Sequence, residues 1–165
     1  LYLSMLKEAL KSNKSSEYEK HLYEVNFYDS AYIGTNYLPS PTERLKIYKK
    51  IQITSNNDKV DEIKQNLIDR CGKMPNESMN LLNNKKIQNR IVNTGIKSIK
   101  SYEDRTNFML SSNLKDSILD NLLNLISKDS NKYSLTKDNK FIYKFIESDA
   151  NKRRNNVNLL LDEIL

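Results

Sequence analysis

The spacing of apolar residues constrains this fold most strongly, and it changes at Gly95. Between Ser40 and Gly95 the apolar residues recur every three or four positions, which is the period of a helix with one buried face. Beyond Gly95, short alternating runs typical of strands are interleaved with helical stretches. This change of period predicts a group of helices followed by a mixture of strands and helices.

Start and stop signals delimit three helices in the first part. Ser40 is placed to cap a helix that has Pro41 at its first position. The second helix starts at Asn57-Asp58, and Gly72 is expected to end it in the left-handed helical conformation. Pro75 then opens the third helix.

Short strands are predicted on both sides of this helical group. The other predicted elements are a strand over 22–27, strands over 96–102 and 108–110, a helix over 114–127, a hairpin of 133–135 with 141–146, and a last helix over 149–165. The predicted fold class is α+β: a single compact domain with about five or six helices packed with small antiparallel strand pairs.

The first twenty residues have a different character. Residues 1–11 place Leu1, Met5 or Leu6, and Ala9 or Leu10 on one helical face, which predicts the tail of a helix. Residues 12–20 are polar and rich in serine, and we expect a flexible loop there. The main domain is therefore expected to span residues 21–165.

Residue counts exclude several kinds of site. The three glycines, Gly34, Gly72 and Gly95, are too far apart for a phosphate-binding loop or a dinucleotide fingerprint. One cysteine (Cys71) and one histidine (His21) exclude an internal disulfide, a four-ligand zinc site and a defensible catalytic triad. No apolar run approaches the roughly 20 residues of a membrane span. We expect no cofactor, no catalytic site and a reducing, cytoplasmic location.

The charge has two possible explanations. The chain carries 27 basic and 21 acidic residues, a net charge of +6, together with 22 asparagines. Lysine and asparagine have AT-rich codons, so codon drift on a solvated surface is one explanation of the positive charge. Nucleic-acid binding is the other. The dense basic clusters are Lys49-Lys50, Lys85-Lys86 and Lys152-Arg153-Arg154. The last cluster opposes the dipole of its helix, and it is either an exposed turn or a contact to a partner or to DNA.

Several motifs follow one another in the first part of the chain. They are Leu1 to Leu6, Ala31-Tyr32-Ile33, Tyr37-Leu38-Pro39, Arg44 to Ile51, Asp61 to Lys64, and Leu67 to Gly72 followed by Pro75. In this order and spacing they resemble the C-terminal domain of the bacterial transcription-repair coupling factors, the TRCF (Mfd) family. The resemblance is dense from Leu1 to about Gly95 and is weaker, but colinear, to the end.

The resemblance implies a regulatory role without catalysis. Proteins of this family are ATP-dependent DNA translocases that use ATP and Mg²⁺, push stalled RNA polymerase off DNA and recruit the damage sensor UvrA. Their C-terminal domain packs on the N-terminal module, masks the UvrA-binding surface and restrains the motor. By this resemblance residues 1–11 lead in from an upstream motor, and residues 21–165 form a monomeric regulatory domain. A basic nucleic-acid-binding module and a purely structural domain are the alternatives.

One face of the second helix carries the candidate contact residues. At 100° per residue, Asp69 lies opposite the apolar stripe of Val60, Ile63 and Leu67, so we expect it to be exposed. It is either an ordinary solvated acid, a partner for a nearby lysine, or a contact to a cation on the N-terminal module. The resemblance supports the last reading, and the candidate docking residues are Glu62, Asn66, Asp69 and Arg70.

Three positions depart from the family pattern. Gly34 stands where the family usually has proline, which suggests a looser connector. Cys71 replaces the usual phenylalanine and is expected to fill less of the core. Asn66 stands where many relatives carry glutamate, so one charge of the expected contact is lost.

Overall fold

The computed structural model describes residues 23–165, which form five helices and five strands. In chain order the elements are β1 (Glu24–Asn26), α3 (Pro41–Ile53), α4 (Asn57–Cys71), α5 (Asn76–Ile91), β2 (Ile96–Ser101), β3 (Arg105–Leu110), α6 (Asp116–Lys128), β4 (Tyr133–Leu135), β5 (Lys140–Lys144) and α7 (Ala150–Ile164). The α+β class is confirmed. The expectations for residues 1–11, residues 12–20 and His21 lie outside the described residues.

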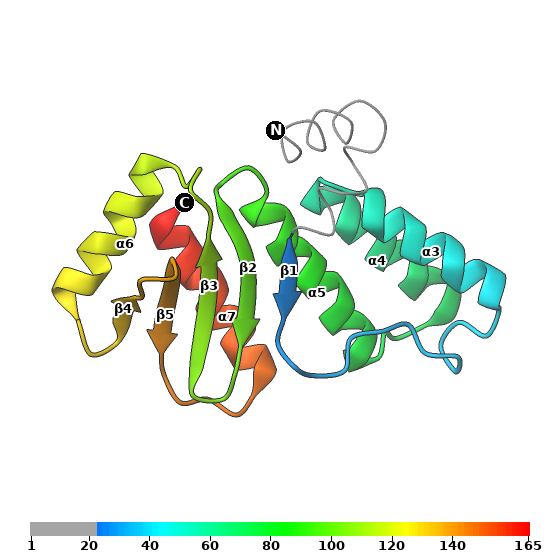
Figure 1. Cartoon of the computed structure of the whole chain (residues 1–165). Coiled ribbons are helices and arrows are strands. Elements are labelled where there is room, and N and C mark those ends of the chain that lie inside the picture. Colours follow the sequence, from blue (N-terminus) through cyan, green and yellow to red (C-terminus); the bar gives the residue numbers. More distant parts are fainter. Residues whose placement is uncertain (1–22) are drawn as a thin grey trace.

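The strands form one mixed sheet rather than separate antiparallel pairs. Its order is β1-β2-β3-β5-β4, and every neighbouring pair is antiparallel except β1 with β2 (Figure 1). The parallel pair sets Val25 opposite Ile99. A parallel pair needs a long crossover, and here the crossover consists of α3, α4 and α5. The hairpin of β4 with β5 and the presence of strands at β2 and β3 were predicted correctly, but the pairings that join β3 to β5 and β2 to β1 were not.

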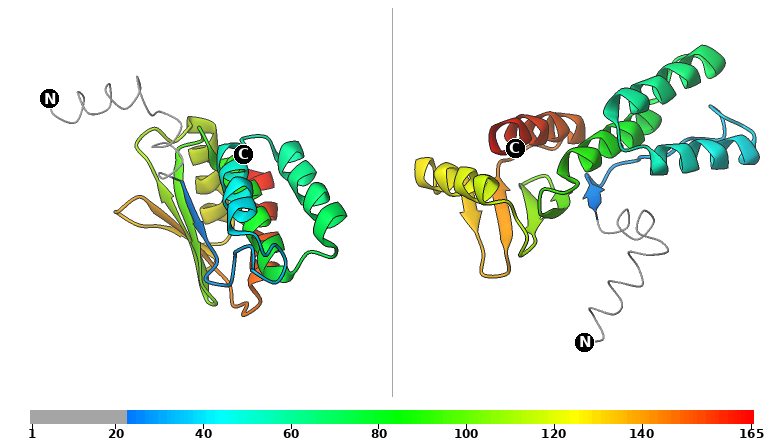
Figure 2. Two further views of the ribbon diagram at one scale, coloured as in Figure 1. Left: turned by 90° about the vertical axis from the view of Figure 1, so that its right-hand side faces the viewer. Right: turned by 90° about the horizontal axis from the view of Figure 1, so that it is seen from above.

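The larger hydrophobic cluster lies between the sheet and three helices. Figure 2 shows α5, α6 and α7 on one side of the sheet. Alternate residues of the central strands, such as the paired Ile99 and Phe108, are buried on that side. The next pair along the two strands, Lys100 and Asn107, is half-buried. The residues of this cluster are Phe27, Ile87, Ile91, Ile96, Ile99, Phe108, Leu110, Ile118, Leu122, Phe141, Val157, Leu160, Leu161 and Ile164.

The second hydrophobic cluster lies beside the sheet, where α3 and α4 pack on the first half of α5 (Figure 1). The connector between β1 and α3 contributes Ile33 and Leu38, and the Tyr48 hydroxyl accepts a hydrogen bond from the Ile33 amide at 2.7 Å. Helix α5 belongs to both clusters, because Leu82 lies in the second and Ile87 lies in the first. This shared helix holds the two parts of the domain together.

The helix ends follow the local signals closely, with one exception. The Ser40 hydroxyl accepts a hydrogen bond from the Glu43 amide at 3.3 Å, and Pro41 is the first helical residue. Helix α4 is capped by Asn56, one residue before the predicted start. Gly72 ends α4 with φ +85° and ψ −162°. That conformation is almost exclusive to glycine, but it is extended in ψ rather than the predicted left-handed helical one.

Gly95, at which the apolar period changes, occupies a position that only glycine fits. Its φ is +94°, and a Cβ atom would lie 2.3 Å from Leu114 Cα and 2.7 Å from Leu114 N. The backbone before α6 is held against this site, since the Ser111 amide donates to the Gly95 carbonyl at 2.8 Å. The close approach of these two backbones positions α6 on the sheet.

We predict that Gly95→Ala lowers the free energy of unfolding by at least about 2 kcal/mol, because the clash with Leu114 involves backbone and a positive φ strains alanine. Urea denaturation measures this change. Gly34→Ala is the control, since its Cβ would meet only side chains at 3.6 Å and 3.9 Å, and it should change stability by no more than about 0.5 kcal/mol. Equal effects of the two substitutions would contradict the packing described here.

Candidate functional site

Helix α4 has the orientation that its apolar spacing predicts. Val60, Ile63 and Leu67 are buried against the second cluster. Cys71 is half-buried and packs against the same cluster, which agrees with its expected role as a small core residue. The opposite side of α4 therefore faces solvent in the described part of the chain.

All four predicted docking residues lie on that exposed side. Glu62, Asn66, Asp69 and Arg70 are exposed, and we call them the α4 face. Their positions differ by four, seven and eight residues from the first, so the helix brings them together on one surface. The predicted exposure of Asp69 is thus confirmed, and the other three residues are exposed as well, whereas the role of all four as contacts stays a prediction.

The charges of the α4 face are only partly satisfied within the domain. Asp69 Oδ1 accepts a hydrogen bond from Gln65 Nε2 at 2.9 Å, and no lysine pairs with it among residues 23–165. Arg70 Nη2 lies 3.4 Å from Glu43 Oε2 on α3. Glu62 and Asn66 form no polar side-chain contact with the described residues. The carboxylates of Glu62 and Asp69 therefore face solvent about two helical turns apart, and neither has an ionic partner among the described residues.

Helix α4 is tied to neighbouring segments near both of its ends. The Tyr37 hydroxyl donates to the Gly72 carbonyl at 2.8 Å and anchors the end of α4 to the connector before α3. Burial, and to a lesser extent Cys71, raises the pKa of Tyr37 above its ordinary value. At the other end, Lys86 Nζ on α5 pairs with Asp61 Oδ1 at 2.8 Å.

The basic cluster of the last helix does not form an exposed turn. Lys152 is exposed, but Arg153 and Arg154 are each only 3% exposed. Asp149 caps α7 through its Oδ1, which accepts from the Asn151 amide at 2.8 Å. Residues 153 and 154 lie four and three positions before Val157, so the helix places them on the same buried face. These two residues, the buried arginine pair, are therefore not available to DNA or to a partner.

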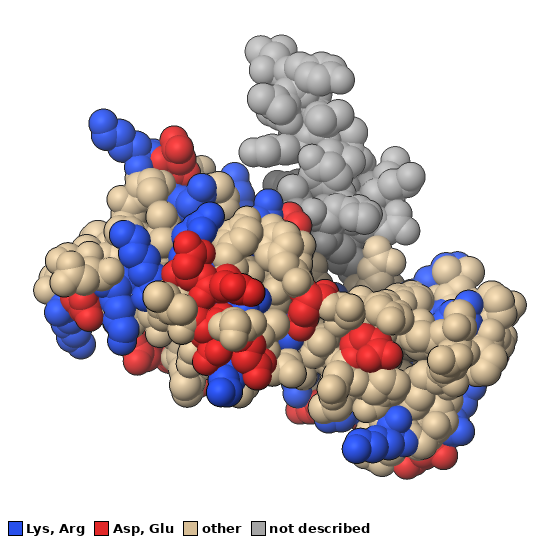
Figure 3. All heavy atoms as spheres, turned by 90° about the horizontal axis from the view of Figure 1, so that it is seen from below, with Lys and Arg blue, Asp and Glu red and all other residues tan. Residues whose placement is uncertain are grey.

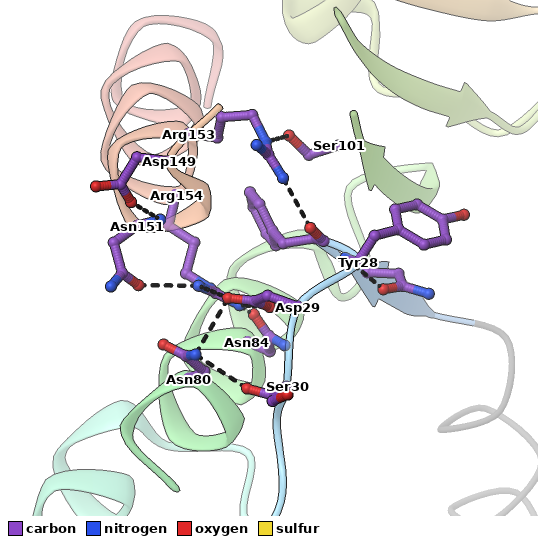
Figure 4. A network of polar contacts seen from close by, with 12 residues as sticks. Tyr28, Asp29, Ser30, Asn80, Asn84, Ser101, Asp149, Asn151, Arg153 and Arg154 are labelled. Carbon is purple, nitrogen blue, oxygen red and sulfur yellow. Dashed lines mark hydrogen bonds and ion pairs between the residues drawn. The ribbon is translucent and has the colours of Figure 1, made fainter. Parts of the chain in front are cut away.

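Arg153 joins α7 to the end of the sheet (Figure 4). Its guanidinium donates to the Phe27 carbonyl at 2.8 Å, to Ser101 Oγ at 3.1 Å, and to the Glu147 and Ser148 carbonyls at 2.9 and 3.0 Å. Ser101 Oγ also shares a 2.8 Å hydrogen bond with Thr106 Oγ1. The charge is thus surrounded by oxygen acceptors from three separate segments of the chain.

Arg154 joins α7 to α5 and to the loop after β1. It forms two bonds to the Asp29 carboxylate, one of them Nη1 to Oδ2 at 2.8 Å. It also donates to Asn84 Oδ1 at 2.8 Å and to Asn151 Oδ1 at 2.9 Å, and it stacks over the Phe27 ring at 4.8 Å from the centroid. The Asp29 side chain is 24% exposed, so this ion pair is largely shielded from water.

No candidate metal site is found among the described residues. Within residues 23–165 no group of three or more histidine, cysteine, aspartate or glutamate side chains is placed to hold a metal ion. Among the same residues no helix is both long and apolar enough to cross a membrane.

Comparisons with known proteins agree on one family. The TRCF domain model matches residues 29–120, a range that includes the α4 face and stops before α7. A transcription-repair-coupling factor of Buchnera aphidicola is 36% identical over 107 residues, which is 61% of this chain and 13% of that protein. The Staphylococcus aureus (strain USA300) transcription-repair-coupling factor is 35% identical over 103 residues, 61% of this chain and 9% of that protein. The chain thus spans about a tenth of the length of these relatives.

One solved structure has the same fold. The crystal structure of the C-terminal domain of a transcription-repair coupling factor superimposes with a TM-score of 0.73, covering 86% of this chain and 91% of that one. Only 14% of the aligned residues are identical, so this likeness establishes the arrangement of helices and strands and nothing about individual contacts.

We predict that Arg154→Met lowers the free energy of unfolding by about 3 kcal/mol, because it leaves the shielded Asp29 carboxylate without its ionic partner. Lys152→Met is the matched control on the neighbouring exposed position and should change stability by no more than about 0.5 kcal/mol. Urea denaturation measures both.

A double variant separates this ion pair from general loss of packing. Arg154→Met combined with Asp29→Asn should cost less than the sum of the two single changes, because the second change removes the charge that the first leaves unpaired. Strict additivity would show that the ion pair contributes nothing specific.

Proposed function

Because the chain belongs to the TRCF domain family, we propose that it is a non-catalytic regulatory domain that restrains a DNA-translocating motor. In this proposal the domain docks on the N-terminal module of the same protein. The docked form masks the surface that binds UvrA and keeps the motor inactive until RNA polymerase stalls. The chain's fold, that of a transcription-repair coupling factor C-terminal domain, supports this assignment.

The observation that carries the proposal is the α4 face. Glu62 and Asp69 are exposed on a rigid helix without an ionic partner among the described residues. Complementary charge across an interface selects the partner surface and fixes its register. A cationic patch on the N-terminal module would satisfy both carboxylates. The face also lies within the part of the chain that the TRCF domain model matches.

Asn66 sets the expected strength of this contact. An acidic residue at this position would add a third negative charge between Glu62 and Asp69, but asparagine is neutral. Each 1.4 kcal/mol of lost docking energy shifts the ratio of docked to undocked forms about tenfold. We therefore propose that the docked form of this protein is held more weakly than in relatives with glutamate at this position.

The activity itself would belong to other parts of the protein. We propose that the whole protein is an ATP-dependent DNA translocase acting in transcription-coupled repair in the cytoplasm. ATP and Mg²⁺ would bind its motor, and DNA, RNA polymerase and UvrA would meet this domain only indirectly. The fragment would be a monomer and would not hydrolyse ATP.

We predict that Asp69→Arg in the full-length protein raises basal ATPase activity without RNA polymerase and increases capture of UvrA. The substitution replaces attraction by like-charge repulsion, which at a partly desolvated contact costs several kcal/mol. Asn66→Glu should act in the opposite direction. Steady-state ATPase rates and a UvrA pull-down measure both effects.

Asp120→Arg on α6 is the matched control, because Asp120 is exposed and lies outside the α4 face. All three variants should melt like the wild type, since exposed substitutions usually cost no more than about 0.5 kcal/mol. If Asp69→Arg melts normally and neither readout moves, the docking surface lies elsewhere. If deleting the whole domain leaves basal ATPase unchanged, the domain is purely structural.

The structure weakens the alternative of a nucleic-acid-binding module. In the densest basic cluster, Lys152-Arg153-Arg154, two of the three cationic side chains, Arg153 and Arg154, are buried and so cannot contact DNA. Lys86 of a second cluster pairs with Asp61. On the face shown in Figure 3, acidic side chains gather in the middle and basic ones are scattered around them.

We predict that this chain binds duplex DNA only within the non-specific range of about 10⁻⁴–10⁻⁶ M at physiological salt. A fluorescence anisotropy titration repeated at several salt concentrations measures the affinity and its salt dependence. Binding below a micromolar Kd, with a steep salt dependence, would favour the nucleic-acid alternative instead.

A further inference from the structure

A small pocket between α5 and α7 is walled by asparagines. It has a volume of about 190 Å³, and Met79 and Arg154 also line it. The asparagines come equally from the two helices: Asn76, Asn80 and Asn83 from α5, and Asn151, Asn155 and Asn158 from α7. We call this the asparagine pocket. It is separate from the α4 face, which shares no residue with it.

Several of these side-chain amides form hydrogen bonds within the described residues through only one of their two polar atoms. Asn80 is 8% exposed, and its Nδ2 donates to Asp29 Oδ2 at 3.1 Å and to the Ser30 carbonyl at 2.9 Å. Its Oδ1 accepts nothing from the described residues. Asn151 is the converse, because its Oδ1 accepts from Arg154 and its Nδ2 is left without a partner in residues 23–165. Figure 4 shows this acceptor and this donor pointing to the same side of the Arg154–Asp29 pair.

The remaining amides extend the same surface. Asn158 Oδ1 accepts from Arg90 at 3.0 Å, which leaves its Nδ2 available. Asn76, Asn83 and Asn155 form no side-chain hydrogen bond with the described residues. The pocket therefore presents both donors and acceptors, and the nearly buried Asn80 is already oriented by its two hydrogen bonds.

The charge balance of the pocket favours a neutral ligand. Among the described residues that line it, Arg154 alone is charged, and Asp29 already neutralises it. An anion would find no free cation there, and a cation would find no free carboxylate. Paired donors and acceptors suit a carboxamide, which carries one of each in the same plane.

The spacing of the amides suits an extended polypeptide. Residues four apart on a helix rise by about 6 Å, and alternate residues of an extended chain are about 6.6 Å apart. Asn76 and Asn80 on one wall, and Asn151 and Asn155 on the other, have this four-residue spacing. The pocket is also smaller than the roughly 300–1,000 Å³ of sites for whole small-molecule ligands. It fits a short piece of chain better than a cofactor.

From these observations we propose that the asparagine pocket binds the carboxamide groups of an extended, uncharged polypeptide segment of a partner protein. The Asn80 oxygen accepts from a peptide N–H, and the Asn151 nitrogen donates to a peptide carbonyl. Recognition through the backbone makes the site tolerant of sequence but intolerant of charge.

Titration followed by nuclear magnetic resonance tests the proposal, because asparagine side-chain amides give their own signals. The 165-residue chain is titrated separately with a blocked neutral tripeptide (N-acetyl-Gly-Ala-Gly N′-methylamide), with propionamide and with acetate. We expect the tripeptide to shift the side-chain signals of Asn80, Asn151 and Asn158 saturably and together. The exposed Asn124 on α6 should not follow them.

Substitutions make the test specific to this pocket. Asn83→Leu combined with Asn155→Leu should weaken tripeptide binding at least about fivefold, the equivalent of one ordinary hydrogen bond. Both residues are exposed and have no intramolecular side-chain bond to lose, so the variant should fold normally, and Asn124→Leu should bind like the wild type.

The three probes distinguish the sources of the ligand. Stronger binding of propionamide would support the carboxamide chemistry and assign it to a partner's asparagine or glutamine side chain. Acetate binding as tightly as the tripeptide would overturn the proposal, because the site would then be an anion site. The absence of any saturable shift with either amide would overturn it as well.

Discussion

The buried arginine pair is the interaction on which the rest of the domain depends. Arg153 and Arg154 are adjacent in sequence and both almost fully buried, yet they diverge, one toward the end of the sheet and the other toward Asp29 and α5. Burial of a guanidinium is unfavourable unless its donors are satisfied, and here the acceptors come from segments as far as 126 residues away in the chain. The pair therefore forms only when β1, β2, α5 and α7 are all in place, which ties the assembly of the sheet to that of the helices.

How far the sequence predicted this structure depended on the range of the interactions. The cap at Ser40 and the exposure of Asp69 follow from residues within one or two turns, and both were predicted correctly. The burial of Arg153 was missed because its acceptors include Ser101, 52 residues away. The parallel pairing of β1 with β2 was missed for the same reason, since nothing local in a three-residue strand encodes its partner.

The two candidate surfaces differ in what a single sequence reveals about them. The α4 face lies on one helix, so helical geometry alone placed its four residues together. The asparagine pocket needs two helices to face each other. Its sequence signal was the same spacing of asparagines in two separate segments, Asn76, Asn80 and Asn83 in one and Asn151, Asn155 and Asn158 in the other. In a chain that has 22 asparagines, such a spacing has no meaning until the fold brings the two helices together. The first surface presents uncompensated charge and the second presents uncompensated amides, so they suit different partners.

The sharing of α5 between the two hydrophobic clusters has a mechanical consequence. Leu82 and Ile87 are five residues apart on α5 and belong to different clusters, so no flexible linker lies between the cluster that supports α4 and the cluster that supports the sheet. A force applied to α4 is carried along a continuous helix to the sheet and not absorbed by a hinge. A domain built in this way transmits load as a strut does, and separating its two halves requires either the rupture of a whole cluster or the breakage of α5 itself.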